Sequence, residues 1–266
     1  MYDVIIVGAG PAGSAAALYA HRLGLNCILL DKAVFPRDKI CGDALSGKSV
    51  RLMRELDLLD GLEQLEGSEI NRITFGSPSH SQFDVYLKGN KNNDHIKKGY
   101  VIPRKIFDNF LFEKANKVTE TRQGFTVSDI VYQGNDISGV RGANNEGHEE
   151  ILEAPIIMGC DGANSIVARK LGLYEMDMEN TAVAIRCYYE GVEGLSDQIE
   201  LHYVDEVKPG YFWLFPAGEG KANIGIGLSK NDAKKDDRTL RQIMDEIVQS
   251  DYFRSRFGNA HPLEKP

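Results

Sequence analysis

The feature that most constrains this chain is a glycine-rich loop near its N-terminus, between an apolar run and an alanine-rich segment. Residues 2–7 end in the apolar letters VIIV and predict a buried parallel strand, and residues 8–13 read GAGPAG. Residues 14–23 predict a helix, and residues 27–30 predict a second buried strand that ends at Asp31. The order strand, glycine loop, helix, strand, acid predicts a βαβ unit of the Rossmann type.

The glycines and the acid of such a unit each have a physical role. Gly8 permits the tight turn, Gly10 lets the backbone approach a pyrophosphate, and Gly13 lets the helix pack closely on the strand. The helix N-terminus directs backbone N–H groups at phosphates, and Asp31 can accept hydrogen bonds from a ribose diol. The residues expected to contact a dinucleotide here are Gly8, Gly10, Pro11, Ala12, Gly13, Asp31 and Lys32.

The alternative to a dinucleotide site is a glycine-rich turn without a ligand. Gly13 and Asp31 are 18 residues apart (31 − 13), close to the roughly 20 that a dinucleotide fingerprint shows, and this spacing argues against a bare turn. The unit alone leaves FAD, NAD and NADP open. An acid at position 31 disfavours a 2′-phosphate, so NADP is the least expected of the three.

Composition excludes several other classes. The 266 residues allow one large domain or two smaller ones, and the net charge of -8 argues against a sequence-independent grip on nucleic acid. The 4 cysteines include no CxxC pair, so we expect no metal site and no disulfide framework, and a reducing cytoplasm is the default location. No apolar run approaches the length that spans a bilayer.

Two further loops lie where ligands bind in open parallel sheets. Residues 35–46 follow the ribose-binding strand directly, and Ser46 is expected to cap a helix over 47–56. Within this loop, Cys41 taken alone is more often an inert thiol than a catalytic one. Residues 156–172 predict a strand that ends in Asp-Gly before a helix, which on its own is compatible with a purely structural turn.

Taken together, these motifs carry a family resemblance. The loop GAGPAG at 8–13 with CDGANSIVAR at 160–169 resembles the FAD fold of the glutathione-reductase type, in the branch that holds flavoprotein hydroxylases and geranylgeranyl reductases. Residues 36–46, PRDKICGDALS, resemble the pattern PxxKxCGDxxS of the geranylgeranyl reductases. The letters YFWLFP at 211–216, followed by NIGIG at 223–227, resemble their YxWxFP and GxG motif. The resemblance covers essentially the whole chain.

The resemblance implies FAD as cofactor, with NAD(P)H or another reductant as electron donor. It implies reduction of C=C bonds in an isoprenoid or other apolar substrate by hydride transfer from reduced flavin. It also places Arg104 before a long helix near the flavin and the backbone of Val127 near the adenine, although Arg104 could equally begin a solvated helix. The residues that the resemblance adds to the cofactor site are Cys41, Gly42, Asp43, Arg104, Val127, Asp161 and Gly162.

Three aromatic residues alternate along one predicted strand. Tyr211, Trp213 and Phe215 therefore share a face, which could be a packed core face or an aromatic wall that lines an apolar substrate cavity. The resemblance supports the aromatic wall as well as the packed core face, since both can hold. It implies that all three residues bind substrate. It implies catalytic roles for Cys41, Tyr211 and Trp213, in which Cys41 tunes the flavin or relays a proton and does not act as a nucleophile.

The predicted fold class is α/β: a Rossmann-type FAD-binding domain with a parallel sheet, plus a discontinuous antiparallel-sheet substrate domain. We assign residues 1–69 and 101–173 to the FAD-binding domain, and 70–100 and 174–232 to the substrate domain. Residues 233–257 predict one amphipathic helix within a helical C-terminal segment, 233–266. The family's third FAD motif, Gly-Asp-Ala-Ala-like, does not occur in the sequence, so we expect a C-terminally truncated fragment that binds FAD poorly.

Two alternatives to a reductase stay open at this point. One is a flavin-dependent monooxygenase or halogenase, although a halogenase would be expected to show WxWxIP where this chain has YFWLFP. The other is a non-catalytic flavin-binding module. The expected partner is an apolar isoprenoid-like small molecule and no nucleic acid. Peripheral contact with a membrane on its cytoplasmic face, the oligomeric state, the prenyl chain length and the head group are not fixed by the sequence.

Overall fold

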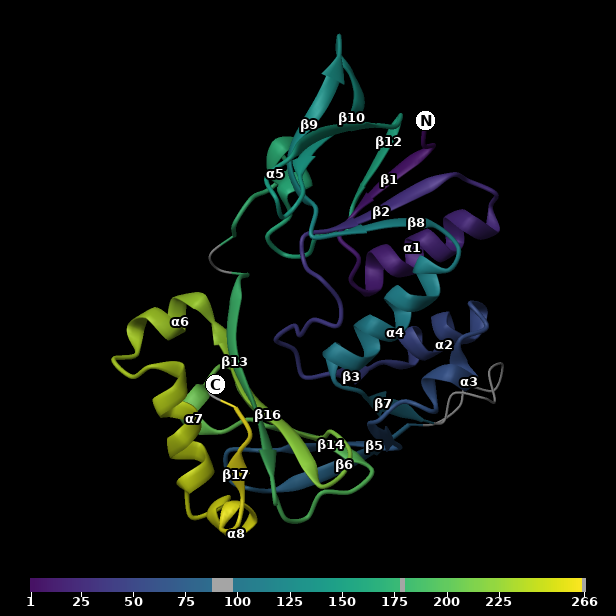
Figure 1. The fold of residues 1–266 in the computed structure, drawn as a ribbon. Coiled ribbons are helices and arrows are strands. Elements are labelled where there is room, and N and C mark those ends of the chain that lie inside the picture. Colours follow the sequence, from purple (N-terminus) through teal and green to yellow (C-terminus); the bar gives the residue numbers. More distant parts are fainter. Residues whose placement is uncertain (88–97, 178–179, 265–266) are drawn as a thin grey trace. The chain divides into compact units, whose positions relative to one another are not determined.

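The computed structural model describes residues 1–87, 98–177 and 180–264. The chain divides into two compact units, each formed by two separate stretches of sequence (Figure 1). The first unit comprises Met1–Asp38 and Lys105–Glu175, and the second comprises Lys39–Arg104 and Met176–Pro266. Parallel pairing in the first unit and mainly antiparallel pairing in the second confirm the predicted α/β class.

The first unit is built on a parallel sheet. Within the described residues, its order is β12-β1-β2-β8, and every neighbouring pair is parallel. The strands are β1 (Val4–Val7), β2 (Cys27–Asp31), β8 (Glu120–Gln123) and β12 (Ile156–Gly159). Helix α1 (Pro11–Arg22) connects β1 to β2, so the predicted βαβ unit is present.

The two faces of this sheet bury alternate side chains. Val4 and Ile6 face α1 and the helix α4 (Arg104–Asn116), where they share a core with Phe112. Ile5 and Val7 face the other layer, where they pack against an antiparallel sheet and a short helix. That layer consists of β9 (Thr126–Gln133), β10 (Asp136–Ala143), β11 (Glu149–Glu153) and α5 (Ile166–Lys170). Because both faces are covered at the centre of the sheet, β1 and the first four residues of β2 are continuously apolar and buried, whereas the edge strand β8 reads ETRQ.

The second unit is built on a large mixed sheet. Among the described residues its order is β17-β13-β16-β15-β14-β5-β6, antiparallel except for the parallel pair of β14 and β5. The strands are β5 (Arg72–Gly76), β6 (Gln82–Tyr86), β13 (Ala182–Glu190), β14 (Gln198–His202), β15 (Tyr211–Pro216), β16 (Lys221–Ser229) and β17 (His261–Pro262). The predicted discontinuous antiparallel sheet is therefore present, with β5 and β6 contributed by one stretch of the chain and the other five strands by another.

A smaller three-stranded sheet and two helices belong to the same unit. In the described part of the chain, β3 (Ala44–Leu45) and β4 (Ser68–Ile70) pair antiparallel with β7 (Gly99–Val101). Helix α2 (Gly47–Glu55) begins as expected, because the Ser46 side chain accepts a hydrogen bond from the Ser49 backbone N–H. Helix α3 (Leu59–Leu62) follows it.

The two faces of the mixed sheet have different surroundings. On one face, Phe212, Leu214 and Ile224 form a core with α7 (Leu240–Gln249) and α8 (Arg254–Phe257). On the other face lie Trp213 and Phe215, which share a second core cluster with Ile70 and Val101. The strand period of two therefore separates a helix-covered face from a face that borders a cavity.

The prediction of one helix over 233–257 is wrong. The segment instead contains α6 (Lys230–Lys235), α7 and α8. The Asp236 side chain accepts hydrogen bonds from the Arg238 backbone and guanidinium, and Thr239 with Gln242 forms a capping box that starts α7. Such short polar side chains bond the nearby backbone in competition with helix continuation, so the apolar period alone overestimated the helix.

The predicted domains state which segments bind the cofactor and which bind the substrate. The two compact units are instead defined by contacts within the chain. Residues 39–69 belong by contacts to the second unit, whereas the sequence assigns them to the FAD-binding domain. A segment of one unit can bind a ligand that another unit also binds. The assigned domains therefore stay a prediction about ligand contacts.

Candidate functional site

The glycine loop of the first unit has no room for side chains at two positions. Gly8 has φ +99, and a Cβ there would lie 2.5 Å from the carbonyl oxygen of Cys160. A Cβ at Gly13 would lie 1.8 Å from the carbonyl oxygen of Gly8. The loop therefore runs against the turn after β12 and against its own first residue, which is the close packing predicted from the glycine spacing.

The N-terminus of α1 presents its backbone donors without a competing side chain. Gly10 is the N-cap and makes no side-chain capping bond, and Pro11 occupies the first turn. Arg37 lies beside this end of the helix, since its Nη2 is 3.1 Å from the position that a Cβ at Gly10 would take. A helix N-terminus with a guanidinium beside it is suited to a phosphate group.

Arg37 is held in place from two sides. Its Nη1 donates to Oδ2 of the buried Asp108 at 2.6 Å, and its guanidinium lies 4.8 Å from the centroid of the Phe35 ring. The sequence analysis did not single out Arg37 as a ligand contact. The available signal was a basic residue in the loop that follows the ribose-binding strand, but its approach to Gly10 depends on the fold of the loop.

Asp31 lies at the end of β2, as predicted. Its two carboxylate oxygens accept hydrogen bonds from backbone N–H groups, Oδ2 from Ala9 at 2.7 Å and Oδ1 from Ala33 at 2.8 Å. These bonds fix the carboxylate beside the glycine loop, and each oxygen keeps a second lone pair for a hydroxyl donor. Lys32, the next residue, is exposed. The glycine cradle, the open helix end and the oriented acid fit the ADP portion of FAD.

Asp161 is placed to organise the turn between β12 and α5. Its Oδ2 accepts hydrogen bonds from the N–H groups of Ile166 at 2.6 Å and Val167 at 3.4 Å. Its Oδ1 is buried and has no hydrogen-bond partner among the described residues. Gly162 has φ +80 and is exposed, as a tight turn requires. Val127 lies in β9 with a buried side chain.

The loop before β3, in the second unit, contains a strained acidic residue. Asp43 has φ +66, and its side chain is almost completely buried. Its Oδ2 accepts hydrogen bonds from the Tyr188 hydroxyl at 2.5 Å and from Asn223 Nδ2 at 2.7 Å, and its Oδ1 accepts one from the Arg104 N–H at 3.3 Å. Left-handed backbone at a non-glycine residue persists only where the surroundings hold it, as these bonds do here.

Burial raises the pKa of the Asp43 carboxyl, while the hydrogen bonds from Tyr188 and Asn223 and the charge of Arg186 act in the opposite direction. The three donors around Asp43 fit an acceptor-only carboxylate. Asp43 therefore organises its surroundings as a hydrogen-bond acceptor.

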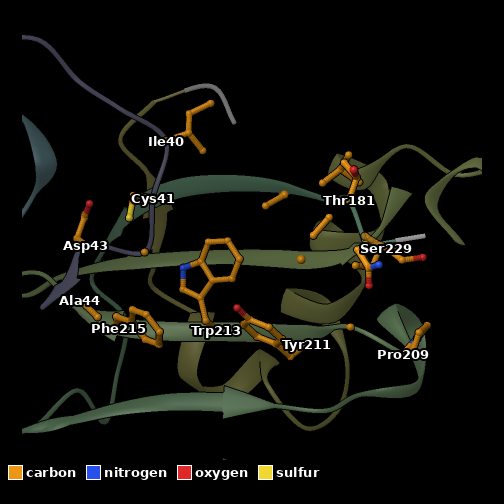
Figure 2. A pocket seen from close by; sticks show the side chains of 18 residues that line it. Ile40, Cys41, Asp43, Ala44, Thr181, Pro209, Tyr211, Trp213, Phe215 and Ser229 are labelled. Carbon is orange, nitrogen blue, oxygen red and sulfur yellow. The ribbon is translucent and has the colours of Figure 1, made fainter. Parts of the chain in front are cut away.

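A cavity of about 690 Å³ opens beside this loop, and all of its lining residues belong to the second unit. Figure 2 shows Tyr211, Trp213 and Phe215 along β15, with Cys41 and Asp43 on the adjoining loop. The ring centroids of Trp213 lie 6.1 Å from those of Tyr211 and 6.4 Å from those of Phe215. The structure thus brings together the Cys41–Asp43 loop and the strand β15, although they are separated by about 170 positions in the sequence (211 − 41).

The expectation that the three aromatic residues share a face is confirmed, and that face borders the cavity. Trp213 and Phe215 are buried and belong to a core cluster as well, whereas Tyr211 is partly exposed. The face is therefore part core and part cavity lining, and its binding of substrate stays a prediction. Two residues that the sequence analysis gave no role, Tyr188 and Asn223, connect the loop to the sheet.

The predicted site residues fall into two sets. The glycine loop, Asp31, Val127 and the Asp161 turn belong to the first unit. Cys41, Gly42, Asp43, Arg104 and the three aromatic residues belong to the second. None of the described helices is both long and apolar enough to cross a membrane.

Relatives of known sequence carry reductase names. A digeranylgeranylglycerophospholipid reductase of Methanosarcina acetivorans is 32% identical over 244 residues, which are 88% of this chain and 56% of that protein. A menaquinone reductase of Mycobacterium tuberculosis is 32% identical over 256 residues, 91% of this chain and 59% of that protein. The chain therefore spans somewhat more than half the length of these relatives.

Solved structures share the fold at lower identity. A geranylgeranyl bacteriochlorophyll reductase-like protein from Thermoplasma acidophilum superposes with a TM-score of 0.86 and 24% identity, over 99% of this chain and 64% of that chain. A triple mutant of the flavin-dependent brominase Bmp2 gives a TM-score of 0.86 at 21% identity, over 100% of this chain and 67% of that chain. At these identities the likeness shows the fold of an FAD-dependent flavoprotein.

The family model described as FAD binding domain matches residues 1–263. The match includes the glycine loop, Asp31, the Asp161 turn and the aromatic strand. The expected resemblance to the geranylgeranyl reductases is confirmed by the relatives, and the family match shows that the chain belongs to the FAD binding domain family.

Proposed function

We propose that this protein is part of an FAD-dependent oxidoreductase of the geranylgeranyl reductase type, which reduces C=C bonds of an isoprenoid or other apolar substrate. The observation that carries the proposal is the cavity of the second unit, where Trp213 and Phe215 form an apolar wall beside the Cys41–Asp43 loop. Its volume of about 690 Å³ lies in the range of small-molecule sites. The reductases among the relatives favour an isoprenoid-like occupant.

The proposal gives the chain's own residues the following roles. The glycine loop, the α1 N-terminus and Arg37 hold the pyrophosphate of FAD, and Asp31 accepts the ribose hydroxyls. Tyr211, Trp213 and Phe215 exclude water and orient an apolar chain, whose isolated C=C bond is a poor electrophile and depends on positioning. Cys41 lines the same cavity, and in this proposal it tunes the cofactor or relays a proton. Bound FAD supplies the hydride-transfer chemistry.

The electron donor in this proposal is NAD(P)H or another reductant of the cytoplasm. An isoprenoid lipid partitions into bilayers, so the proposal includes peripheral contact with the cytoplasmic face of a membrane. The electron donor rests on the family resemblance, and the membrane contact rests on the chemistry of the proposed substrate.

Ligand binding to the cavity can be measured directly, because Trp213 is the only tryptophan of the chain and lines the cavity. Titration of the apoprotein with geranylgeraniol in dilute detergent is expected to change the Trp213 emission with saturation. Phytanol, the fully saturated alcohol with the same carbon skeleton as geranylgeraniol, tests whether the double bonds matter. An emission that stays constant throughout the titration would count against the apolar site.

Activity is tested with the product of the full-length gene. Under anaerobic conditions, the reduced flavin is expected to be reoxidised by a prenyl lipid, and mass spectrometry of extracted lipids is expected to show gains of two hydrogens per reduced bond. Product formation that requires O₂ would instead support a monooxygenase or halogenase. Flavin binding without either reaction would support a non-catalytic module.

A further inference from the structure

One buried amide connects the two walls of the cavity. Asn223 lies on β16 and is completely buried. Its Oδ1 accepts a hydrogen bond from the indole N–H of Trp213 at 2.9 Å. Its Nδ2 donates to the carbonyl oxygen of Cys41 at 2.8 Å and to the Asp43 carboxylate at 2.7 Å.

These bonds leave the amide no second orientation. A carboxamide has two N–H donors, and both of them are used on the loop, while its oxygen is used on the indole. Rotation of the amide by 180° would place N–H groups against the indole N–H of Trp213 and an oxygen against two acceptors. Because an unsatisfied buried polar group is costly, the network holds one arrangement.

The indole of Trp213 is also confined from the neighbouring strand. A Cβ at Gly225 would lie 2.2 Å from Cζ2 of Trp213, so the ring rests directly on the backbone of β16. A Cβ at Gly42 would lie 2.8 Å from Cε2 of Phe215, so the loop approaches the same aromatic wall closely. The loop and the wall thus touch at Gly42 and are hydrogen-bonded through Asn223.

We propose that Asn223 is a positioning residue that holds the Trp213 indole and the Cys41–Asp43 loop in one fixed arrangement, so that both bind an apolar ligand as a single surface. Asn223 does not line the cavity, and it acts through Trp213 and the loop. The identity of the ligand rests on the proposed function, whereas the immobilised indole can be measured without any ligand.

The first experiment uses 5-fluorotryptophan, which labels Trp213 alone. The wild-type chain is expected to give one sharp ¹⁹F resonance. Asn223→Ala is expected to shift or broaden it by more than its linewidth and to weaken geranylgeraniol binding by about tenfold, the effect of losing one or two hydrogen bonds. The matched control is Asn71→Ala, in the same unit and outside the cavity, whose Nδ2 donates to Asp197. It is expected to leave the resonance unchanged.

The second experiment exchanges the partners. Asp43→Asn alone places two amide donors together, and Asn223→Asp alone places two carboxylates together. The double variant restores a donor and an acceptor between positions 43 and 223 but leaves the Cys41 carbonyl oxygen without its donor, so it is expected to return the resonance and the ligand affinity part of the way towards the wild type. If Asn223 only filled space, the double variant would not rescue the single variants. The comparison of single and double variants therefore tests the positioning role even if Asn223→Ala fails to fold.

An unchanged resonance in folded Asn223→Ala, or a double variant in which the two effects simply add, would overturn the proposal. If the resonance responds as expected while even the wild type fails to bind geranylgeraniol, the positioning role stands and the proposed substrate class is wrong. The two hypotheses are therefore tested by different readouts of the same samples.

Discussion

The carboxylate of Asp31 at the end of β2 accepts a hydrogen bond from the backbone N–H of Ala9 at 2.7 Å, which ties the acid to the glycine loop. A second bond, from the Ala33 N–H, fixes its other oxygen. The acid is therefore oriented by the protein alone, and a bound ribose would meet a group that loses little conformational freedom.

Replacement of Asp31 by alanine is expected to weaken FAD binding about thirtyfold, since charge-assisted hydrogen bonds to the ribose contribute about 2 kcal/mol. Titration of the apoprotein with FAD, followed by flavin fluorescence, measures the change. The control is Asp3→Ala, which removes an exposed carboxylate bonded to the Asn26 N–H in the same unit. Equal affinities of the Asp31→Ala variant and the wild type would contradict the assigned role.

Gly13→Ala is expected to lower the free energy of unfolding by more than 3 kcal/mol, because the added methyl group would meet the Gly8 carbonyl at 1.8 Å. Gly24→Ala is the comparison, since a Cβ there has no neighbour within 4 Å and only the positive φ of +73 opposes it, at about 1 kcal/mol. Urea unfolding curves separate the two costs. A Gly13→Ala variant as stable as the Gly24→Ala variant would show that the loop can move away.

Two glycines of β16 are expected to differ in their effect on the cavity. Gly227 lines it, and a Cβ there would have only ordinary contacts, the nearest at 3.8 Å to Trp213. Gly227→Val is therefore expected to reduce geranylgeraniol affinity while the melting temperature stays within a few degrees. Gly225→Ala, whose Cβ would overlap Trp213, is expected to lower the melting temperature. If both variants bind the ligand like the wild type, the cavity is not its site.

A buried ion pair predicts acid sensitivity in the second unit. Burial alone would raise the pKa of Glu200, but hydrogen bonds from His202 and Arg256 and the charge of Arg256 outweigh burial and lower this pKa to about 2. A lowered carboxyl pKa stabilises the fold above the ordinary value of 4.5, and this contribution disappears as the pH falls from about 4.5 to about 2.

The free energy of unfolding is expected to fall by on the order of 3 kcal/mol when Glu200 is fully protonated, given the size of its pKa shift. Unfolding free energies measured between pH 7 and about pH 2 are expected to fall steeply in the wild type and less steeply in Glu200→Gln. Glu113→Gln, at an exposed position on α4, is the control and should follow the wild type. Parallel pH profiles for Glu200→Gln and wild type would show that acid sensitivity arises elsewhere.

The sequence alone determined the dinucleotide unit, because its signals are local. The turn at Gly8, the packing at Gly13 and the acid at the end of β2 follow from residues within one βαβ unit, where spacing along the chain sets spacing in the fold. The alternation of Tyr211, Trp213 and Phe215 likewise predicted a shared face. The apolar period gave a wrong prediction at 233–257. There the side chains of Asp236 and Thr239 bond the nearby backbone and interrupt the predicted helix.

The tertiary structure decided what surrounds those local elements. The cavity is assembled from a loop near residue 41 and from β13, β15 and β16, and no sequence spacing predicts which of their faces meet. Asn223 carried no signal of its own, because a single asparagine in a strand pattern is ordinary until its hydrogen-bond partners are known. Arg37 acquires its place beside Gly10 in the same way. Hydrogen bonds and cavities depend on contacts between distant segments, and such contacts are fixed only when the chain packs.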